Sequence, residues 1–210
     1  MDPNKFSFWN DILKDHALFI YLLLDERKVP QLKADVGNLY DEWNTNTLQS
    51  REQFANYLNR LATAKQQLIT LLNQGAVINS ILPPHDFKAL VLHMIKEFNF
   101  ALRDLDNQVN PQEEVGFWKE ESAEHDELAS HSIINNPQIQ TQVMMLAQAL
   151  KTAPNQTQKV LSLIKESNQG AMMLDQMIRN GQVQSIMNLA MLEHEMKEGQ
   201  EAERRLQQLV

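Results

Sequence analysis

The strongest constraint on this chain is a pair of motifs that each occur twice. The sequence FW-x5-DH ends at His16, and FW-x5-EH ends 109 residues later at His125. The sequence H-x2-KE begins at His93 and again 101 residues later at His194. One helical unit present in two copies accounts for both displacements. We therefore expect an all-α protein that arose by internal duplication.

Helical periodicity dominates the sequence between these motifs. Phe8, Ile12, Phe19 and Leu23 share one narrow face at about 100° per residue. Proline, glycine and paired asparagines mark the expected helix boundaries. The predicted helices span residues 3 to shortly before 30, then 31–43, 50–73, 86–107, 111–132, 138–151, 155–180 and 182–209, with an interruption expected at 168–170. Short connections between them predict two tandem up-down four-helix bundles, at residues 1–109 and 110–210.

The composition excludes several classes of function. A hydrophobic fraction of 43% is enough for a packed core, and 6 Gly with 7 Pro argue against a turn-rich β protein. The net charge of −8 and the lack of a basic stripe argue against nucleic acid as a partner. Cysteine is absent, which excludes disulfides, thiolate zinc sites and a cysteine nucleophile.

The sequence also bears on localisation and partners. No basic segment followed by an apolar core and a cleavage site occurs at the N-terminus. The most apolar run, residues 17–24, is too short to span a bilayer. We expect a cytoplasmic, soluble protein with no membrane partner. A homodimer and a separate protein partner both stay open.

The repeated histidines are expected at the edge of the core. On a helical projection His16 lies beside the apolar face that contains Ile12, and His125 takes the same place in the second copy. Glu121 replaces Ile12 in that copy, which puts a carboxylate in the middle of a face expected to be buried. Glu121 and His125 are one helical turn apart.

The last helix of each half carries the partner residues. His93 and Glu97 are four residues apart on a facet flanked by apolar side chains, and His194 and Glu198 repeat them. In the second half, the carboxylate of Glu201 replaces the apolar Phe100 of the first half. The predicted metal ligands are Glu121, His125, His194, Glu198 and Glu201, with a second, poorer set of His16, His93 and Glu97.

Chemistry explains why this pattern favours a metal. Burying several ionised carboxylates is costly unless a cation compensates them. Inward-facing Glu and His on bundle helices bind iron or manganese, and a sulfur-free set also suits zinc. Two other interpretations stay open: His16 and His93 as core-edge histidines hydrogen-bonded to carboxylates, and residues 195–203 as an acidic solvated face. His85 and His131 are expected at the surface.

At these motifs the chain resembles a known group. Residues 8–20, the PP-x2-F entry at 83–87 and the last helix with His194 and Glu198 resemble an uncharacterised bacterial family with a duplicated ferritin-like bundle, best represented in spore-forming bacilli. The resemblance implies a pair of four-helix bundles and a metal site of His and Glu ligands. It implies no established reaction. The second copy departs from the pattern, because residues 125–128 read HDEL without the apolar continuation of the first.

The leading hypothesis is a ferritin-like, metal-binding helical protein, with iron or manganese as the metal. Bound iron with open positions gives access to oxygen or peroxide chemistry, so a metal-dependent oxidase or peroxide-handling enzyme is one interpretation. A hemerythrin-like iron or oxygen sensor is the near alternative. A metal-free scaffold that binds a protein partner through residues 193–203 is the third. No catalytic residue is predicted, and no nucleotide-binding signature is present.

Overall fold

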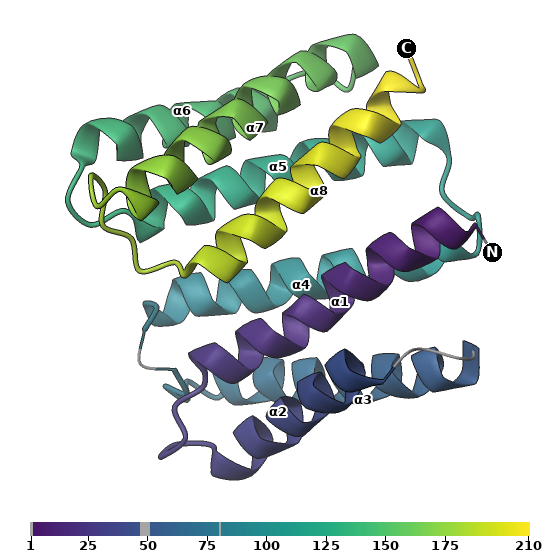
Figure 1. The fold of residues 1–210 in the computed structure, drawn as a ribbon, viewed down its shortest axis with the longest axis vertical. Coiled ribbons are helices and arrows are strands. Elements are labelled where there is room, and N and C mark those ends of the chain that lie inside the picture. The colour runs from purple at the N-terminus through teal and green to yellow at the C-terminus, as the bar shows by residue number, and fades with distance from the viewer. Residues whose placement is uncertain (1, 47–50, 80) are drawn as a thin grey trace. The chain divides into compact units, whose positions relative to one another are not determined.

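The protein is helical throughout the parts that its computed structural model describes, which are residues 2–46, 51–79 and 81–210 (Figure 1). The all-helical prediction is confirmed, and no strand occurs within these ranges. No helix among the described residues is long and apolar enough to cross a membrane. The helices are α1 (Pro3–Leu23), α2 (Pro30–Thr45), α3 (Arg51–Asn73), α4 (Pro84–Leu105), α5 (Pro111–Ser132), α6 (Pro137–Thr152), α7 (Thr157–Arg179) and α8 (Leu189–Gln207).

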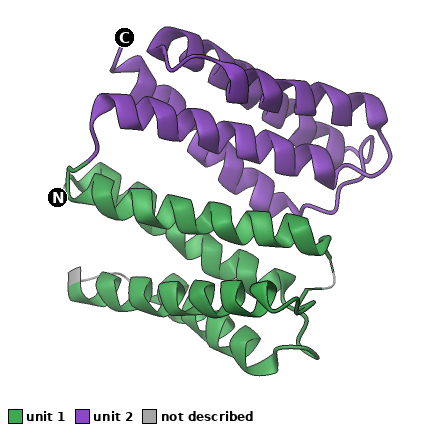
Figure 2. Cartoon of the chain, turned by 180° about the vertical axis from the view of Figure 1, so that it is seen from behind, with its two compact units in different colours: residues 1–108 green, residues 109–210 purple. Residues whose placement is uncertain are grey.

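The chain divides into two compact units (Figure 2). Unit 1 is Met1–Gln108 and contains α1 to α4, and unit 2 is Val109–Val210 and contains α5 to α8. In unit 1, α1 packs on α2, α3 and α4, and α3 packs on α2 and α4. In unit 2, α5 packs on α6, α7 and α8, and α7 packs on α6 and α8. Each unit therefore has its own core.

Proline starts helices more often than the sequence interpretation assumed. Pro30, Pro84 and Pro137 each occupy the first turn of a helix, although each was expected to precede one. Proline fits there because its fixed φ is helical and its missing N–H has no intrahelical acceptor at that position. The helices therefore start one or two residues earlier than predicted. The predicted start of the third helix at residue 50 lies outside the described residues.

Two predictions for unit 2 were wrong. The last helix begins at Leu189 rather than near residue 182. The preceding segment is held in extended form by backbone hydrogen bonds, from Ile134 N to Gln184 O and from Ile186 N to Ser132 O. The expected interruption at 168–170 is also absent, because α7 is continuous from Thr157 to Arg179.

Asn168 has a tertiary role that explains its place inside α7. Its side-chain amide donates a hydrogen bond of 2.9 Å to the carbonyl of Gly199 on α8. A Cβ atom at position 199 would lie 1.9 Å from Asn168 Oδ1. The close approach of α7 and α8 at this level therefore depends on glycine.

The buried tryptophan of each unit takes part in a polar contact between the first and last helices of that unit. In unit 1, Trp9 Nε1 donates to Asp104 Oδ2 at 2.8 Å, and Lys5 Nζ lies 2.6 Å from Asp104 Oδ1. Trp9 and Asp104 are 0% and 2% exposed. This contact joins the start of α1 to the end of α4.

In unit 2 the positions that correspond to Asp104 and Lys5 carry residues of the opposite charge. Arg205 stands where Asp104 stands in the first copy and lies 5.6 Å from the centre of the Trp118 ring. It also contacts Glu114, at the position of Lys5, with 3.2 Å between Nη1 and Oε1. Both units therefore have a polar contact between their first and last helices, but the charged residues of that contact have opposite signs in the two units.

We predict that Gly199→Ala lowers the free energy of unfolding by about 1–3 kcal/mol, because the new methyl group displaces the Asn168 side chain and overpacks the α7–α8 contact. Chemical denaturation followed by circular dichroism measures the change. The double variant Asn168→Ala/Gly199→Ala should recover part of the loss, since it removes the clashing amide. Equal stability of Gly199→Ala and the wild type would contradict the packing described here.

Candidate metal centre

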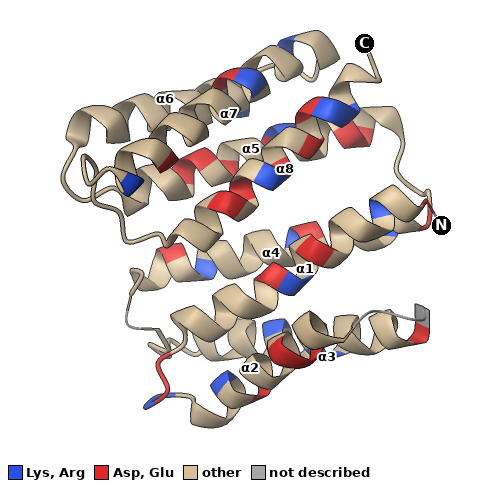
Figure 3. Ribbon diagram, in the orientation of Figure 1, with Lys and Arg blue, Asp and Glu red and all other residues tan. Residues whose placement is uncertain are grey.

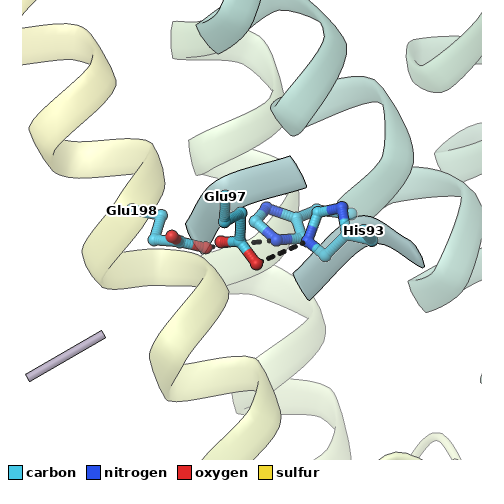
Figure 4. A group of neighbouring side chains, drawn as sticks. His93, Glu97 and Glu198 are labelled. Atoms are coloured by element: carbon cyan, nitrogen blue, oxygen red, sulfur yellow. Dashed lines mark ion pairs between the residues drawn. The ribbon is translucent and has the colours of Figure 1, made fainter. Parts of the chain in front are cut away.

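Unit 1 brings together its three predicted ligands. His16 comes from the middle of α1, and His93 and Glu97 lie one turn apart on α4. Nε2 of His16 and Nε2 of His93 lie 2.9 Å and 3.5 Å from the same atom, Glu97 Oε2. All three residues are buried. Figure 4 shows His93 and Glu97 with their ion pair.

Unit 2 builds the same arrangement from the corresponding positions. His125 lies on α5, and His194 and Glu198 lie one turn apart on α8. Nε2 of His125 and Nε2 of His194 lie 3.2 Å and 3.3 Å from Glu198 Oε2. Glu198, which Figure 4 also labels, is 1% exposed.

These separations have the size expected for ligands of one cation. Metal bonds to His nitrogen and carboxylate oxygen of about 2.0–2.2 Å, at angles between 90° and tetrahedral, place neighbouring ligand atoms roughly 2.8–3.6 Å apart. The four nitrogen–oxygen distances of the two units, 2.9 and 3.5 Å and 3.2 and 3.3 Å, fall in that range. Buried histidine and glutamate side chains of this protein, with Glu97 and Glu198 among them, could hold a metal ion.

The charge of Glu97 is not compensated by hydrogen bonding. Both of its carboxylate oxygens are buried, and neither accepts a hydrogen bond of good geometry from the described part of the chain. The nearby imidazole nitrogens approach at hydrogen-bonding distance but outside hydrogen-bonding alignment. An ionised carboxylate in this position requires a cation.

Glu121 occupies the inward position predicted from its register. It is 1% exposed, as Ile12 is 0% exposed at the corresponding place in unit 1. It precedes His125 by one turn of α5, and one of its ligand atoms lies within 4.8 Å of one of Glu124. Unit 2 therefore buries the carboxylate of Glu121 on the helix that carries His125.

Glu201 has a different environment from the one predicted for it. Its Oε1 atom accepts from Arg204 and Arg205 at 2.6 and 2.7 Å, and its Oε2 atom accepts from Arg204 at 2.7 Å. These hydrogen bonds lower the pKa of Glu201 against the opposing effect of burial. Both oxygens are engaged by guanidinium groups, so we leave Glu201 out of the ligand set.

The helix α8 carries both acidic and basic residues, with acidic residues in the majority (Figure 3). His194, Glu195 and Glu198 are buried, whereas Glu193 is half exposed and pairs with Arg179 at 2.7 Å. The interpretation of residues 195–203 as an acidic solvated face is therefore wrong for Glu195 and Glu198. The surface positions predicted for His85 and His131 are confirmed, because both are exposed.

The sequence interpretation missed several buried polar groups, of which Lys65 and Asp126 lie next to proposed ligands. Lys65 on α3 is 2% exposed, and its Nζ atom donates to the Met94 carbonyl at 2.6 Å and lies 2.9 Å from His16 Nδ1. Burial lowers the pKa of Lys65 to about 7, and the charge of Glu97 opposes that shift. The signal was present, because Lys65 falls on the apolar face defined by Leu61 and Leu68.

The second group is Asp126, which follows His125 in the sequence. Ser167 on α7 donates a hydrogen bond of 3.0 Å to its Oδ1 atom. Burial raises the pKa of Asp126 to about 7, against the lowering effects of the Ser167 hydrogen bond and the nearby His125. An acidic residue adjacent to a histidine on a polar-looking helix carries no sequence signal of burial.

Comparison with known proteins supports the architecture alone. The crystal structure of an uncharacterized protein from Bacillus cereus G9241 matches with a TM-score of 0.68 and 17% sequence identity, covering 97% of this chain and 88% of that chain. At this level of identity the likeness shows the fold. No family model matches the chain, and no curated protein matches it.

The raised pKa of Asp126 predicts a pH dependence of stability in the metal-free protein. The folded state keeps the Asp126 proton between about pH 4 and pH 7, where the unfolded state has lost it. The free energy of unfolding should therefore fall as the pH rises through this window and level off above about pH 7. A shift of this size corresponds to at most about 4 kcal/mol.

Asp126→Asn removes the titrating group, so it should flatten this part of the stability profile and gain stability relative to the wild type as the pH rises. Denaturation in the presence of a chelator at pH 4.5, 6 and 8 measures the effect. Glu127→Gln is the matched control, because Glu127 is its half-exposed acidic neighbour and pairs with Lys151. Parallel profiles for the wild type and Asp126→Asn would disprove the assignment.

Proposed function

We propose that this protein is a metal-binding helical protein of ferritin-like architecture, built from two copies of a four-helix bundle. The metal is iron or manganese, with zinc as the third choice, and unit 2 provides the principal site. Its ligands are His125, His194 and Glu198, with Glu121 as a further carboxylate. Nitrogen and oxygen ligands without sulfur suit these metals.

One observation carries the proposal. In each unit, two imidazole Nε2 atoms from different helices approach a single buried carboxylate oxygen at distances of 2.9–3.5 Å. An apolar core gains nothing from such a group, because burying an ionised carboxylate is costly. A cation bound at this point would form favourable bonds with the carboxylate and the imidazoles, and these bonds would offset the cost of burial.

The duplication is supported by the equivalence of the two sets. His16 and His125 take the same place relative to the buried tryptophan of their helix, and His93 and His194 lie at the same distance from their glutamate along the chain. The same residue types therefore converge through the same pair of helices in both copies. A chance arrangement of polar core residues has no reason to recur in this way.

The ligand set also bears on chemistry. Two histidines and one carboxylate are the set that non-haem iron enzymes use, and they leave positions on the metal to which oxygen or peroxide can bind. Oxidase or peroxide-handling activity is thus within reach of this site. A metal without such activity would leave storage, sensing or structural binding as its role.

The test is elemental analysis of protein purified without a metal-chelating step. The double variant His125→Ala/His194→Ala removes both unit 2 imidazoles, so we expect it to lose one metal per chain relative to the wild type. His85→Ala/His131→Ala is the matched control, since it removes two exposed histidines. Both variants are first compared with the wild type by circular dichroism.

If the wild type contains less than one metal per chain and the unit 2 double variant contains the same amount, the metal-site proposal is contradicted. That result would favour a metal-free scaffold. If metal is lost as expected, oxygen consumption by the iron-loaded wild type and its turnover of hydrogen peroxide test the enzymatic role. No turnover above that of the unit 2 double variant would leave binding without catalysis.

A further inference from the structure

Two consecutive residues of α7 contact the neighbours of two proposed ligands. Ser167 donates a hydrogen bond of 3.0 Å to Asp126, the residue that follows the histidine ligand on α5. Asn168 donates a hydrogen bond of 2.9 Å to the carbonyl of Gly199, the residue that follows the glutamate ligand on α8. None of the proposed ligands lies on α7 itself. This helix therefore contacts both ligand-carrying helices of unit 2, in each case one residue away from a ligand.

The spacing of the unit 2 ligands depends on how α5 and α8 are held relative to each other. His194 and Glu198 lie one turn apart on α8, so the helix itself fixes their separation. The 3.2 Å between His125 Nε2 and Glu198 Oε2, by contrast, joins two different helices. Metal–ligand distances are matched to within about 0.2 Å, so a larger shift of either helix would spoil the fit to a metal ion.

The two contacts made by α7 are sheltered from solvent. Ser167 and Asp126 are both 6% exposed, Gly199 is buried and Asn168 is half-buried. Hydrogen bonds are electrostatically stronger inside a protein than in water. These contacts can therefore hold α5 and α8 against α7 at the level of the ligands.

The packing of α7 on α8 constrains α8 on both sides of its ligands. Arg179 pairs with Glu193 at 2.7 Å directly before the histidine ligand, and Asn168 contacts Gly199 directly after the glutamate ligand. The side chains of Arg179 and Glu193 are 44% and 52% exposed, and exposed ion pairs contribute little. The Asn168 contact is thus the stronger of these two constraints on α8.

Glycine at position 199 permits this contact. A Cβ atom there would lie 1.9 Å from Asn168 Oδ1. Unit 1 has Phe98 at the corresponding position, 101 residues earlier in the sequence. The close approach of the asparagine amide to the backbone therefore belongs to unit 2.

We propose that Ser167 and Asn168 are positioning residues of the unit 2 metal site, which together set the distance between His125 on α5 and Glu198 on α8. This inference rests on the proposed function. Groups that hold metal ligands in place without being ligands themselves contribute about 10–100-fold to metal affinity. The helix α7 thus takes part in metal binding although it carries no proposed ligand.

The experiment titrates metal-stripped full-length protein with Co²⁺, because the absorption bands of this ion depend on the number and arrangement of its ligands. The signal of unit 2 is the difference between the wild type and His125→Ala/His194→Ala. The variant Ser167→Ala/Asn168→Ala keeps every proposed ligand. We expect unit 2 of this variant to bind Co²⁺ about ten-fold more weakly or worse, with shifted absorption bands.

Ser162→Ala/Gln169→Ala is the matched control, because it removes one hydroxyl and one amide from exposed positions of α7. It should keep the affinity and bands of the wild type. The inference would be overturned if Ser167→Ala/Asn168→Ala behaved like this control in both respects. If circular dichroism shows that the double variant has lost its helices, the two single variants carry the test, and wild-type bands in both would count equally against it.

A second arm keeps both hydrogen-bonding side chains. Gly199→Ala displaces the Asn168 side chain and should also weaken Co²⁺ binding by unit 2 and shift its bands. Gly170→Ala is the control, because its new Cβ would lie 3.3 Å from Leu146 Cδ1 and so tightens the contact of α7 with α6 instead. Wild-type bands in Gly199→Ala, or the same shift in Gly170→Ala, would refute a positioning role of this contact.

Failure of the proposed function gives a different result. The wild type and His125→Ala/His194→Ala would then have the same Co²⁺ spectrum, and both proposals would fall together. Failure of the present inference alone leaves that difference in place and removes only the effect of the α7 variants.

Discussion

The burial of a glutamate between two histidines is the constraint on which this structure depends. Glu97 and Glu198 are 0% and 1% exposed, inside units whose cores consist mainly of aliphatic and aromatic side chains. Each is held where the last helix of its unit packs on the first. An isolated ionised carboxylate at such a point would cost several kcal/mol.

The two units place different residues around the buried glutamate. Unit 1 places Lys65 next to His16, whereas unit 2 buries the carboxylate of Glu121 where unit 1 has Ile12. The contact around the buried tryptophan is likewise retained with its charges exchanged, from an aspartate in unit 1 to Arg205 in unit 2. The geometry of these contacts is kept between the two copies, while the charges of the residues that make them differ.

The helical periodicity was sufficient to place most helices, because an amphipathic face is a local property of the sequence. It failed where tertiary contacts decided the outcome. The last helix starts at Leu189 because the preceding segment pairs its backbone with residues 132–134. Asn168 and Gly170 did not interrupt α7, because the asparagine amide is satisfied by α8 rather than by its own backbone.

The sequence by itself determined the all-helical class, the repeated histidines and the inward register of Glu121, since spacing along a helix fixes which side chains share a face. The tertiary structure alone decided which polar groups meet. Glu201 lies one turn from Arg205 and is engaged by it, so its position on the helix did not make it a ligand. Lys65 reaches His16 across 49 residues of chain. Contacts of this kind depend on how helices distant in sequence pack together, so they cannot be predicted from the spacing of residues along the chain.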